Sequence, residues 1–442
     1  MRSLPTTNTN LSRRAFQKLS LAGLASLGWA ADSQAADSVA NTTPETFVPV
    51  ETITSGPKHH WFGYYDKREF DPTSRKVLTN QVDFEHRSPK AEDQIQVGWV
   101  DRDDNNRFVQ IGTSNAWGWQ QGCMLQWVGG EGKRVLWNDR QGDQFVCRIM
   151  TVADKSVRTI PRPIYTISAD GRYGLSADFR RINNLRPGYG YAGLADPYVD
   201  QRAPAEEGIW RTDLQTGESQ LIISLADVTK IAWPDGELHT DAWHYFNHLL
   251  INPSGNRFVF LHRYRPKFDP QTLQFKGGFV TRMFSADMDG KNLHNVDPSG
   301  YTSHFIWKND EQLDMWTRPA GRPSGFYRFT DRQPGETLID ATAMPTNGHN
   351  TYLPAPYSDW ILNDTYPSKQ TTKQTVYLYH IPSKRRFDLG RFPSSLKYRG
   401  EWRCDTHPRS SDDGLTVAID SPHAGGRQVH LLDVSEIVRA NS

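Results

Sequence analysis

The chain of 442 residues lacks the features that two large classes of protein require. Its 51 Lys and Arg residues nearly balance its 50 Asp and Glu residues, whereas a nucleic-acid-binding protein usually carries a basic excess on one face. No stretch of the sequence approaches the roughly 20 apolar residues that a membrane-spanning helix needs. We therefore expect no nucleic-acid partner and no membrane anchor.

Cysteine is also scarce. The three cysteines, Cys123, Cys147 and Cys404, are far apart in the sequence and form no CxxC pair. This excludes a disulfide framework and a thiolate-bound zinc cluster. A single disulfide between any two of them stays open.

Aromatic and turn-forming residues, by contrast, are abundant. The chain has 14 Trp, 17 Tyr and 20 Phe, together with 34 Gly and 27 Pro, although only 37% of its residues are hydrophobic. So many aromatic residues argue against a disordered polymer, and Gly and Pro are the residues of tight turns. The composition predicts an all-β protein with many short strands.

The first 35 residues are expected to be an export signal. Residues 12–18 contain a twin-arginine pattern, residues 19–31 are weakly apolar, and residues 33–35 offer small residues for cleavage. A chance Arg-Arg pair in a general secretory signal is the alternative. We expect a twin-arginine signal peptide over residues 1–35 and a mature protein in the periplasm or secreted. Because this route exports folded proteins, a bound metal is somewhat favoured.

Seven hairpin-like segments recur along the rest of the chain. Each combines a strand-like run, a tight turn and a second strand-like run. They occupy residues 68–79, 125–137, 165–177, 249–261, 305–316, 352–363 and 409–420. Since one propeller blade needs about 40–50 residues plus its loops, the spacing predicts a single-domain, seven-bladed β-propeller over residues 46–436. An open β-sandwich or a two-domain β protein is the alternative.

Two irregular segments fit this interpretation. The longest interval between hairpins contains a Gly-, Pro- and Tyr-rich loop at residues 186–205, and long loops in compact domains are often functional. A short strand near Phe47–Thr52 is expected to pair beside residues 427–434 and to close the ring, which removes an exposed sheet edge.

Four histidines keep the same phase in the last four repeats. His248, His304, His349 and His407 precede their hairpin turns by 6, 6, 7 and 6 residues. We expect them to point towards one pole of the ring, where they could bind a divalent metal or transfer protons. We place His248 and His304 among the catalytic candidates. The alternative is that each histidine merely packs against backbone at the start of a strand.

Other polar residues are expected near this pole. Asp405 shares a strand face with His407, so it joins His349 and His407 as a candidate ligand for manganese or calcium, with zinc a further option. The arginines after the fourth hairpin suit a carboxylate ligand, and Arg263 and Arg265 are substrate-binding candidates. Polar residues replace histidine in the first three repeats. The substrate-binding candidates there are Tyr65 and Gln121.

The last four repeats resemble a known family. The segments 280–282, 303–305, 348–350 and 405–408 are similar in order and spacing to motifs of the oligogalacturonate lyases, a family of seven-bladed propeller polysaccharide lyases. The resemblance covers roughly residues 244–434. It implies cleavage of a uronic-acid-containing glycan by β-elimination.

The resemblance also implies roles for individual residues. It implies that Arg282 faces the substrate carboxylate or is catalytic, that His304 is the general base, and that His349 and His407 bind manganese. The family's last blade has a Gln and a second His near the final ligand, where this chain has Cys404 and Asp405, so the metal site is expected to differ or to be absent.

The substrate and an alternative function stay open at this point. The segments at residues 59–67 and 117–127 are closer to propeller lyases that act on glucuronate-containing polymers such as ulvan. The sequence thus predicts an acidic polysaccharide or oligosaccharide as the substrate, without choosing among uronate polymers. A non-catalytic periplasmic propeller that binds a protein or glycan partner is the alternative.

Overall fold

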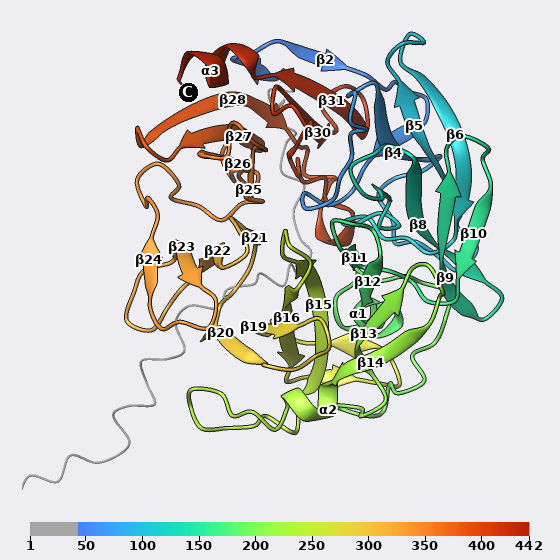
Figure 1. Cartoon of the computed structure of the whole chain (residues 1–442), viewed down its shortest axis with the longest axis vertical. Helices are drawn as coiled ribbons and strands as arrows, with labels where there is room; N and C mark the ends of the chain where they lie inside the picture. The colour runs from blue at the N-terminus through green and yellow to red at the C-terminus, as the bar shows by residue number, and fades with distance from the viewer. Residues whose placement is uncertain (1–42, 442) are drawn as a thin grey trace, which may run out of the picture.

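The predicted hairpins form the inner strands of seven separate antiparallel sheets. The computed structural model describes residues 43–441, and the seven sheets surround a common axis as the blades of a β-propeller (Figure 1). In the first blade, residues 59–61 form the inner strand, and the chain then leaves the sheet and runs towards the axis. When it returns, Phe70 pairs with Val77 only as an isolated bridge. The seven-bladed all-β fold is therefore confirmed.

The first four blades run from the inner strand outwards. Their strands are β3 (His59–Trp61), β4 (Lys76–Val82), β5 (Ile95–Asp101) and β6 (Arg107–Ser114); β7 (Gln126–Trp127), β8 (Arg134–Gln141), β9 (Gln144–Thr151) and β10 (Val157–Ile160); β11 (Thr166–Ile167), β12 (Tyr173–Ser176), β13 (Gly208–Asp213) and β14 (Ser219–Ser224); β15 (Trp243–Ile251), β16 (Arg257–Arg265), β19 (Val280–Asp287) and β20 (His294–Gly300).

The last three blades follow the same order, and two short strands and four short helices lie outside it. The blades comprise β21 (Phe305–Trp307), β22 (Gln312–Thr317), β23 (Gly325–Thr330) and β24 (Glu336–Leu338); β25 (Thr351–Tyr352), β26 (Trp360–Asp364), β27 (Lys373–His380) and β28 (Arg385–Pro393); β29 (Arg409–Ser410), β30 (Thr416–Ser421) and β31 (Gln428–Asp433). The other elements are the hairpin of β17 (Phe268–Asp269) and β18 (Gln274–Phe275), the helices α1 (Phe179–Leu185), α2 (Leu225–Val228) and α3 (Ser435–Ala440), and a 3₁₀ helix at Gly400–Trp402.

The N-terminal strands close the ring. Strand β2 (Val50–Thr52) pairs antiparallel with β31 and becomes the outer strand of the seventh blade, as predicted from the sequence. Strand β1 (Glu45–Thr46) adds a fifth strand to the sixth blade by pairing with β28. The first and last parts of the described chain are thereby joined by backbone hydrogen bonds, which covers sheet edges that would otherwise be open.

Aromatic residues fill the spaces between blades. Trp61, Trp117, Trp119, Trp127 and Trp137 are buried in one cluster that joins the first two blades. This packing accounts for much of the tryptophan content, because large aromatic side chains remove the most apolar surface per residue. The three cysteines are free and buried, so they form no disulfide.

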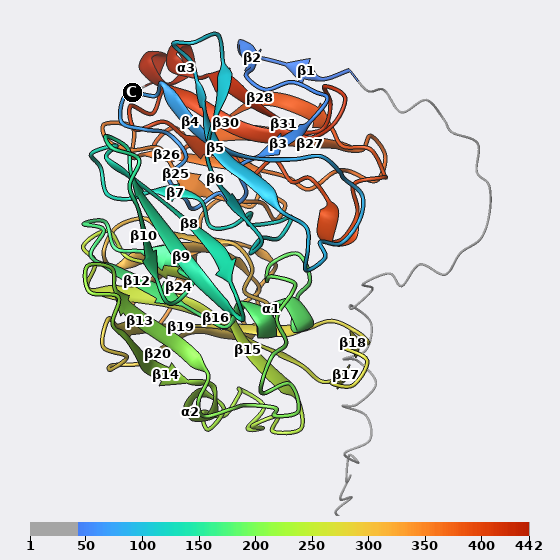
Figure 2. The same ribbon diagram turned by 90° about the vertical axis from the view of Figure 1, so that its right-hand side faces the viewer.

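The longest insertion lies within the third blade, between β12 and β13. Asp178 caps α1 by accepting from the backbone N–H of Arg180 at 2.8 Å. Buried Arg181 then holds the following loop through hydrogen bonds to the carbonyls of Gln201 and Arg202, at 2.9 and 2.8 Å. Gly190 fits here because a Cβ would lie 2.2 Å from the backbone nitrogen of Asn183. Helix α1 and the β17–β18 hairpin project on the same side of the disc (Figure 2).

Two further sequence predictions concern the signal peptide and the lack of a membrane-spanning helix. The proposed signal peptide at residues 1–35 lies outside the described residues. Within residues 43–441, no helix has the length and apolar character to cross a membrane.

Candidate active site and metal centre

The four phased histidines meet at the centre of the ring. The ring centroids of His304 and His407 each lie 4.2 Å from that of His349, and His248 joins the group through Tyr64 and Tyr65. All four imidazoles are buried, with at most 5% of each residue exposed. The common sequence offset thus corresponds to a common position just before three inner strands for His304, His349 and His407, while His248 lies within the bulged strand β15.

Tyr64 and Tyr65 fill the space among these histidines. Both belong to the segment that leaves β3 and detours towards the axis. The ring of Tyr65 contacts all four imidazoles, with centroid distances of 5.7, 5.9, 5.4 and 6.4 Å. Its hydroxyl donates to the carbonyl of Phe305 at 2.9 Å and accepts from the N–H of Phe305 at 3.0 Å. Tyr65, which we predicted to bind substrate, is thus buried and its hydroxyl is engaged with the backbone of Phe305.

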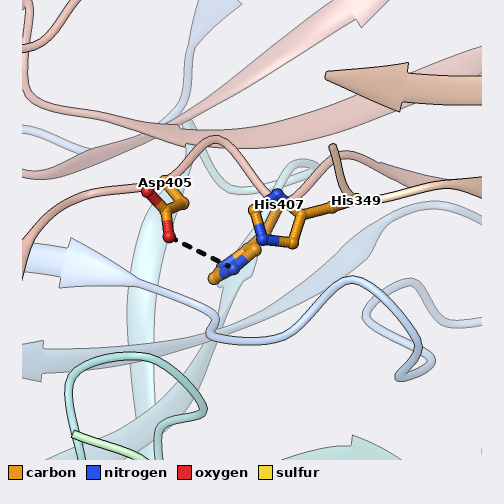
Figure 3. Close-up of side chains that lie close together, drawn as sticks. All are labelled: His349, Asp405 and His407. Atoms are coloured by element: carbon orange, nitrogen blue, oxygen red, sulfur yellow. Dashed lines mark ion pairs between the residues drawn. The ribbon is translucent and has the colours of Figure 1, made fainter. Parts of the chain in front are cut away.

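His349, Asp405 and His407 form a candidate cation site (Figure 3). Their potential ligand atoms all lie within 4.8 Å of one another. Nε2 of His349, Nε2 of His407 and Oδ1 of Asp405 are buried and have no hydrogen-bond partner among the described residues. Leaving three buried polar atoms unpaired is costly, and a cation bound between them would remove that cost. The residues therefore fit a divalent metal.

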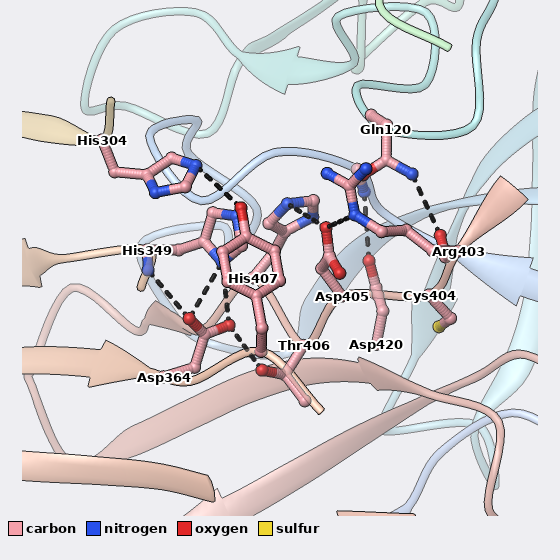
Figure 4. A network of polar contacts seen from close by, with 12 residues as sticks. Gln120, His304, His349, Asp364, Arg403, Cys404, Asp405, Thr406, His407 and Asp420 are labelled. Atoms are coloured by element: carbon pink, nitrogen blue, oxygen red, sulfur yellow. Dashed lines mark hydrogen bonds and ion pairs between the residues drawn. The ribbon is translucent and has the colours of Figure 1, made fainter. Parts of the chain in front are cut away.

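Asp364 orients one of these imidazoles. Its carboxylate accepts from Nδ1 of His349 at 2.9 Å and from the backbone N–H of His349 at 2.8 Å, and Thr406 Oγ1 donates to its other oxygen at 2.6 Å (Figure 4). A proton on Nδ1 leaves the lone pair on Nε2, the atom that faces the other ligands. Carboxylate–histidine pairs of this kind orient metal ligands and make them more basic.

Arg403 connects the cation site to a tyrosine on the long loop. Its Nε donates to Oδ2 of Asp405 at 2.6 Å, and its Nη2 donates to the hydroxyl of Tyr189 at 2.8 Å. Although burial opposes ionisation of the phenol, the guanidinium groups of Arg403 and Arg186 lower the pKa of Tyr189. Oδ1 of Asp405 stays free for a cation while Oδ2 is paired. The neighbouring Cys404 is buried, and burial raises the pKa of its thiol.

His304 has one nitrogen held and one nitrogen available. Nδ1 lies 3.0 Å from Oδ1 of Asn347, whose amide nitrogen donates to Ser303 at 3.1 Å. With this amide orientation, Nδ1 carries the proton and Nε2 carries the lone pair, which accepts from the hydroxyl of Tyr366 at 3.3 Å. Burial and the neighbouring His349 lower the pKa of His304 well below its usual value. The imidazole is therefore neutral near pH 7.

A cavity of about 250 Å³ opens beside His304. His248, Tyr189 and Tyr366 also line it, and so do two arginines, Arg186 and Arg263. Burial lowers the pKa of His248 to about 4, even though Asp66 lies 3.4 Å from its Nε2 and favours the charged form. The cavity therefore combines neutral imidazoles with positively charged guanidinium groups.

The two cavity arginines have no carboxylate partner among residues 43–441. Arg263 donates from Nε to Thr281 Oγ1 at 3.0 Å, and the Nε of Arg186 is buried without a partner. Both guanidinium groups lie over the ring of Phe279, at 4.6 and 4.5 Å from its centroid. Unpaired arginines in a cavity are suited to bind a carboxylate, because their paired N–H groups match its two oxygens.

Arg282 and Arg265, which we predicted to be catalytic and substrate-binding, do not line this cavity. Arg282 is fully buried and donates to the carbonyls of Val228, Ile231 and Ala232, close to helix α2. Arg265 donates to the carbonyls of residues 185, 277 and 278 and lies 3.6 Å from the ring centroid of Phe275. Strand alternation explains the position of Arg282: along β16 and β19, Arg263 and Thr281 face the cavity, whereas Arg282, paired opposite His262, faces the other side. Arg265 shares the face of Arg263 but lies two residues beyond it, at the end of β16.

Gln121 is also held by other protein groups. Its amide nitrogen donates to the hydroxyl of Tyr165 at 2.7 Å. Gln121 is buried and does not line the cavity. Of the predicted substrate-binding residues, the cavity therefore contains only Arg263, and of the predicted catalytic residues it contains His248 and His304.

Known structures share this architecture. An oligogalacturonate lyase from Vibrio parahaemolyticus superposes with a TM-score of 0.60 and 13% sequence identity, over 90% of this chain and 98% of that one. An oligogalacturonate lyase in complex with manganese gives a TM-score of 0.62 and 14% identity, over 90% of this chain and 97% of that one. The fold is that of the oligogalacturonate lyases. This confirms the fold expected from the resemblance, and at such low identity it shows the fold alone.

Comparisons based on sequence, by contrast, give no match. A scan of protein-family models finds no match to the chain, and a search of curated proteins finds none either.

In this oligogalacturonate lyase fold, the site also contains several residues that we did not predict from the sequence. They are Arg186, Tyr189, Asn347, Asp364, Tyr366 and Arg403. Two of them, Arg186 and Tyr189, belong to the long loop at 186–205, whose length suggested a function. Arg403 could have been selected by its spacing of two from Asp405. Tyr366 and Asp364 had no such signal, since they belong to no repeated motif.

Proposed function

We propose that the protein is a lyase that cleaves a uronic-acid-containing glycan by β-elimination and leaves a 4,5-unsaturated uronate end. One observation carries the proposal: neutral His304, whose Nε2 carries a lone pair held only by a 3.3 Å hydrogen bond from Tyr366, shares a cavity with two arginines that have no carboxylate partner among residues 43–441. An elimination next to a carboxylate needs both a base and a group that neutralises the negative charge. The likeness in fold to oligogalacturonate lyases supports the same reaction class.

In this proposal Arg186 and Arg263 hold the uronate carboxylate. The C5 proton of a uronate is weakly acidic because the neighbouring carboxylate already carries a negative charge. Positive groups that bind the carboxylate stabilise the further charge that develops when this proton leaves. Burial lowers the pKa of Arg263, which reflects how little water surrounds the guanidinium, and electrostatic interactions are stronger in such surroundings.

His304 then acts as the base. The C5–H bond breaks, its proton moves to Nε2 of His304, and its electron pair forms the C4=C5 double bond. The C4–O bond breaks at the same time, and the leaving oxygen takes a proton from the hydroxyl of Tyr189, which lines the cavity and accepts a hydrogen bond from Arg403. Asn347 keeps the proton of His304 on Nδ1, so that Nε2 is the atom that receives the substrate's proton.

His349, Asp405 and His407 would hold a divalent metal beside this cavity. When bound, the metal supplies a Lewis acid that lowers the free energy of negative charge on the substrate carboxylate. Two imidazoles and one carboxylate suit manganese or zinc better than calcium, which prefers oxygen ligands. Asp364 and Arg403 keep the protein ligands in place through their contacts with His349 and Asp405.

Incubation with defined uronate polymers tests this function. Polygalacturonate, glucuronate-containing polymers and ulvan are offered with and without a chelator, and the ultraviolet absorbance of an unsaturated uronate is followed. We expect absorbance with at least one polymer, and we expect the His304→Gln variant to lose it. His380→Gln is the matched control, because His380 lies on the sixth blade and contacts Ser383. Full activity of His304→Gln would exclude this histidine as the base.

We also propose that the protein acts after export, in the periplasm or outside the cell. The twin-arginine pattern in residues 12–18 supports this location. Cell fractionation of the full chain, compared with an Arg13→Lys, Arg14→Lys variant, tests it: the variant should accumulate in the cytoplasm.

A further inference from the structure

A second cavity lies directly outside the candidate active site. Its volume is about 560 Å³, and it is lined by β20 of the fourth blade and by residues 318–322 and 333–336 of the fifth. Tyr301 lines both this cavity and the one that contains His304. The two cavities therefore border the same side chain, Tyr301, and the outer one lies between the fourth and fifth blades.

We propose that this outer cavity is a binding subsite for further sugar residues of the same acidic glycan, with Tyr301 as an aromatic platform and Arg318 as a contact for a second carboxylate. The inference rests on the proposed function, because it takes the glycan from the inner cavity as its starting point. It adds a consequence that the proposed function does not contain: the protein should prefer longer chains over the shortest cleavable one.

Tyr301 has the properties of a platform. It is 47% exposed, which is unusual for a large aromatic side chain in this chain. Its backbone is fixed by a bridge to Thr281 of β19. Buried Asp297 holds the chain on both sides of Tyr301, since its Oδ2 accepts from Ser299 Oγ at 3.1 Å and from Thr302 Oγ1 at 2.6 Å. A rigid and exposed ring is suited to stack on the apolar face of a sugar, because little conformational entropy is lost on binding.

Arg318 supplies the charge. Its guanidinium lies 3.5 Å from the centroid of the Tyr301 ring. The described residues place no acidic side chain in contact with Arg318, although the nearby Arg322 pairs with Glu336 at 2.9 Å. An exposed arginine that is stacked but not paired can bind a carboxylate without first breaking an ion pair.

The outer cavity favours sugars over a peptide or a nucleic acid. The edge strand β20 lines it, but Pro298 lacks a backbone N–H and interrupts the row of donors with which a peptide strand would pair. A single arginine beside one aromatic ring is too little positive charge for a polyphosphate backbone. An acidic glycan carries one carboxylate on each uronate, which matches arginines placed at intervals: Arg186 and Arg263 inside, and Arg318 outside.

Cleavage of oligouronates of increasing length tests the subsite. For the wild type, kcat/KM should rise from the shortest cleavable oligomer to the longer ones. In Tyr301→Ala and in Arg318→Gln this rise should shrink by about tenfold, the effect expected when one charged or stacked contact is lost. Tyr301→Phe keeps the ring and should retain the rise. The matched control is Phe47→Ala, because Phe47 is 52% exposed and lies 5.4 Å from the guanidinium of Arg391 on the sixth blade.

The outcomes separate the subsite from the proposed function. Equal losses at every length in Tyr301→Ala and Arg318→Gln, or no loss at any length, would overturn the subsite while leaving the lyase activity in place. Absence of cleavage by the wild type would instead count against the proposed function. In that case calorimetric titration with the same oligomers decides on the subsite: affinity that rises with length and no longer rises in Tyr301→Ala supports it, and affinity independent of length overturns it.

Discussion

Nδ1 of His349 lies 2.9 Å from Oδ1 of Asp364, and Nε2 of the same imidazole is buried with no hydrogen-bond partner in the described part of the chain. The two atoms of one ring are therefore in opposite situations. The carboxylate of Asp364 fixes the proton on one nitrogen, which leaves a lone pair on the other, pointing towards His407 and Asp405 (Figure 3). A ring that served only to pack would gain nothing from an unpaired buried nitrogen.

This relationship predicts how the metal site depends on Asp364. Replacing Asp364 by Asn keeps an oxygen for His349 but removes the negative charge that makes its imidazole a better ligand. We expect the affinity for Mn²⁺ to fall by about 10- to 100-fold, the usual effect of losing such a partner. Calorimetric titration of chelator-treated protein with MnCl₂ measures the change.

Two control variants should have a larger effect and no effect, respectively. His407→Gln removes a direct ligand and should weaken Mn²⁺ binding more than Asp364→Asn does. Asp388→Asn alters a carboxylate that pairs with Arg386 on the outer strand of the sixth blade, and it should leave the affinity unchanged. Equal Mn²⁺ affinity in the wild type and in Asp364→Asn would contradict the role of Asp364.

The fold was readable from the sequence because its signals are local and repeated. Each hairpin turn contains Asp, Ser, Pro or Gly at the position where the chain reverses, and seven such turns at propeller spacing leave few alternatives. The closing strand was predictable for a related reason. The last blade needed one more strand, and residues 50–52 supply it. Register did not have to be known for either conclusion.

The site was readable only in part, because it depends on which face of a strand each residue occupies. The histidines were found through a common offset, and they do converge. Arg263 and Arg282 could not be told apart in the same way, since their facing depends on the pairing register of β16 and β19, which leaves no mark in the sequence. Tyr366 reaches the site from the turn after β26, where no repeat predicts it.

The different positions of the two arginines predict different phenotypes. Arg263→Met removes a guanidinium from the cavity, and we expect kcat/KM for a uronate substrate to fall by about 100-fold, as is typical when a group that stabilises developing charge is lost. Arg282→Met removes hydrogen bonds to three carbonyls near α2. It should lower the thermal stability while the folded enzyme keeps most of its kcat/KM. Kinetics and thermal unfolding of both variants measure the two effects, and the reverse pattern would restore Arg282 to the site.

A buried ion-pair network should be essential for the seventh blade. Arg409 is 2% exposed and donates to Glu69 at 2.8 Å and to Asp420 at 3.1 Å, while Asp420 also accepts from the N–H of Phe62, next to the segment that carries Tyr64. Arg409→Met leaves two carboxylates buried without their partner. We expect the free energy of unfolding to fall by about 3 kcal/mol or more.

Denaturant unfolding measures this loss, with an exposed pair as the control. Arg75 and Asp103 form an ion pair at 2.8 Å, with side chains 62% and 58% exposed. Arg75→Met should therefore change the free energy of unfolding by less than about 1 kcal/mol. Similar losses in Arg75→Met and Arg409→Met would show that burial of the Arg409 network does not increase its contribution to the free energy of unfolding.

Stability should fall as the solution becomes acidic, and the histidines determine the range. Burial lowers the pKa of eight of them: His60, His244, His248, His262, His304, His407, His423 and His430. The pKa of His248 in the folded chain is about 4, against an ordinary value of 6.5. Below about pH 6.5 the unfolded chain therefore binds protons that the folded chain excludes, and this favours unfolding.

Four carboxyl groups act in the opposite direction, and the numbers of groups decide which effect prevails. Burial raises the pKa of Glu69 to about 7 and that of Glu207 to about 8, and it also raises the pKa of Asp196 and of Glu401, so these groups stabilise the fold as the pH falls towards their usual values. Eight histidines against four carboxyl groups give a net loss. The urea midpoint of chelator-treated protein should decrease between about pH 7 and about pH 5. A midpoint that stays constant or increases over this range would mean that the buried imidazoles take up protons without unfolding, and the neutral state that we assign to His304 would then have to be abandoned.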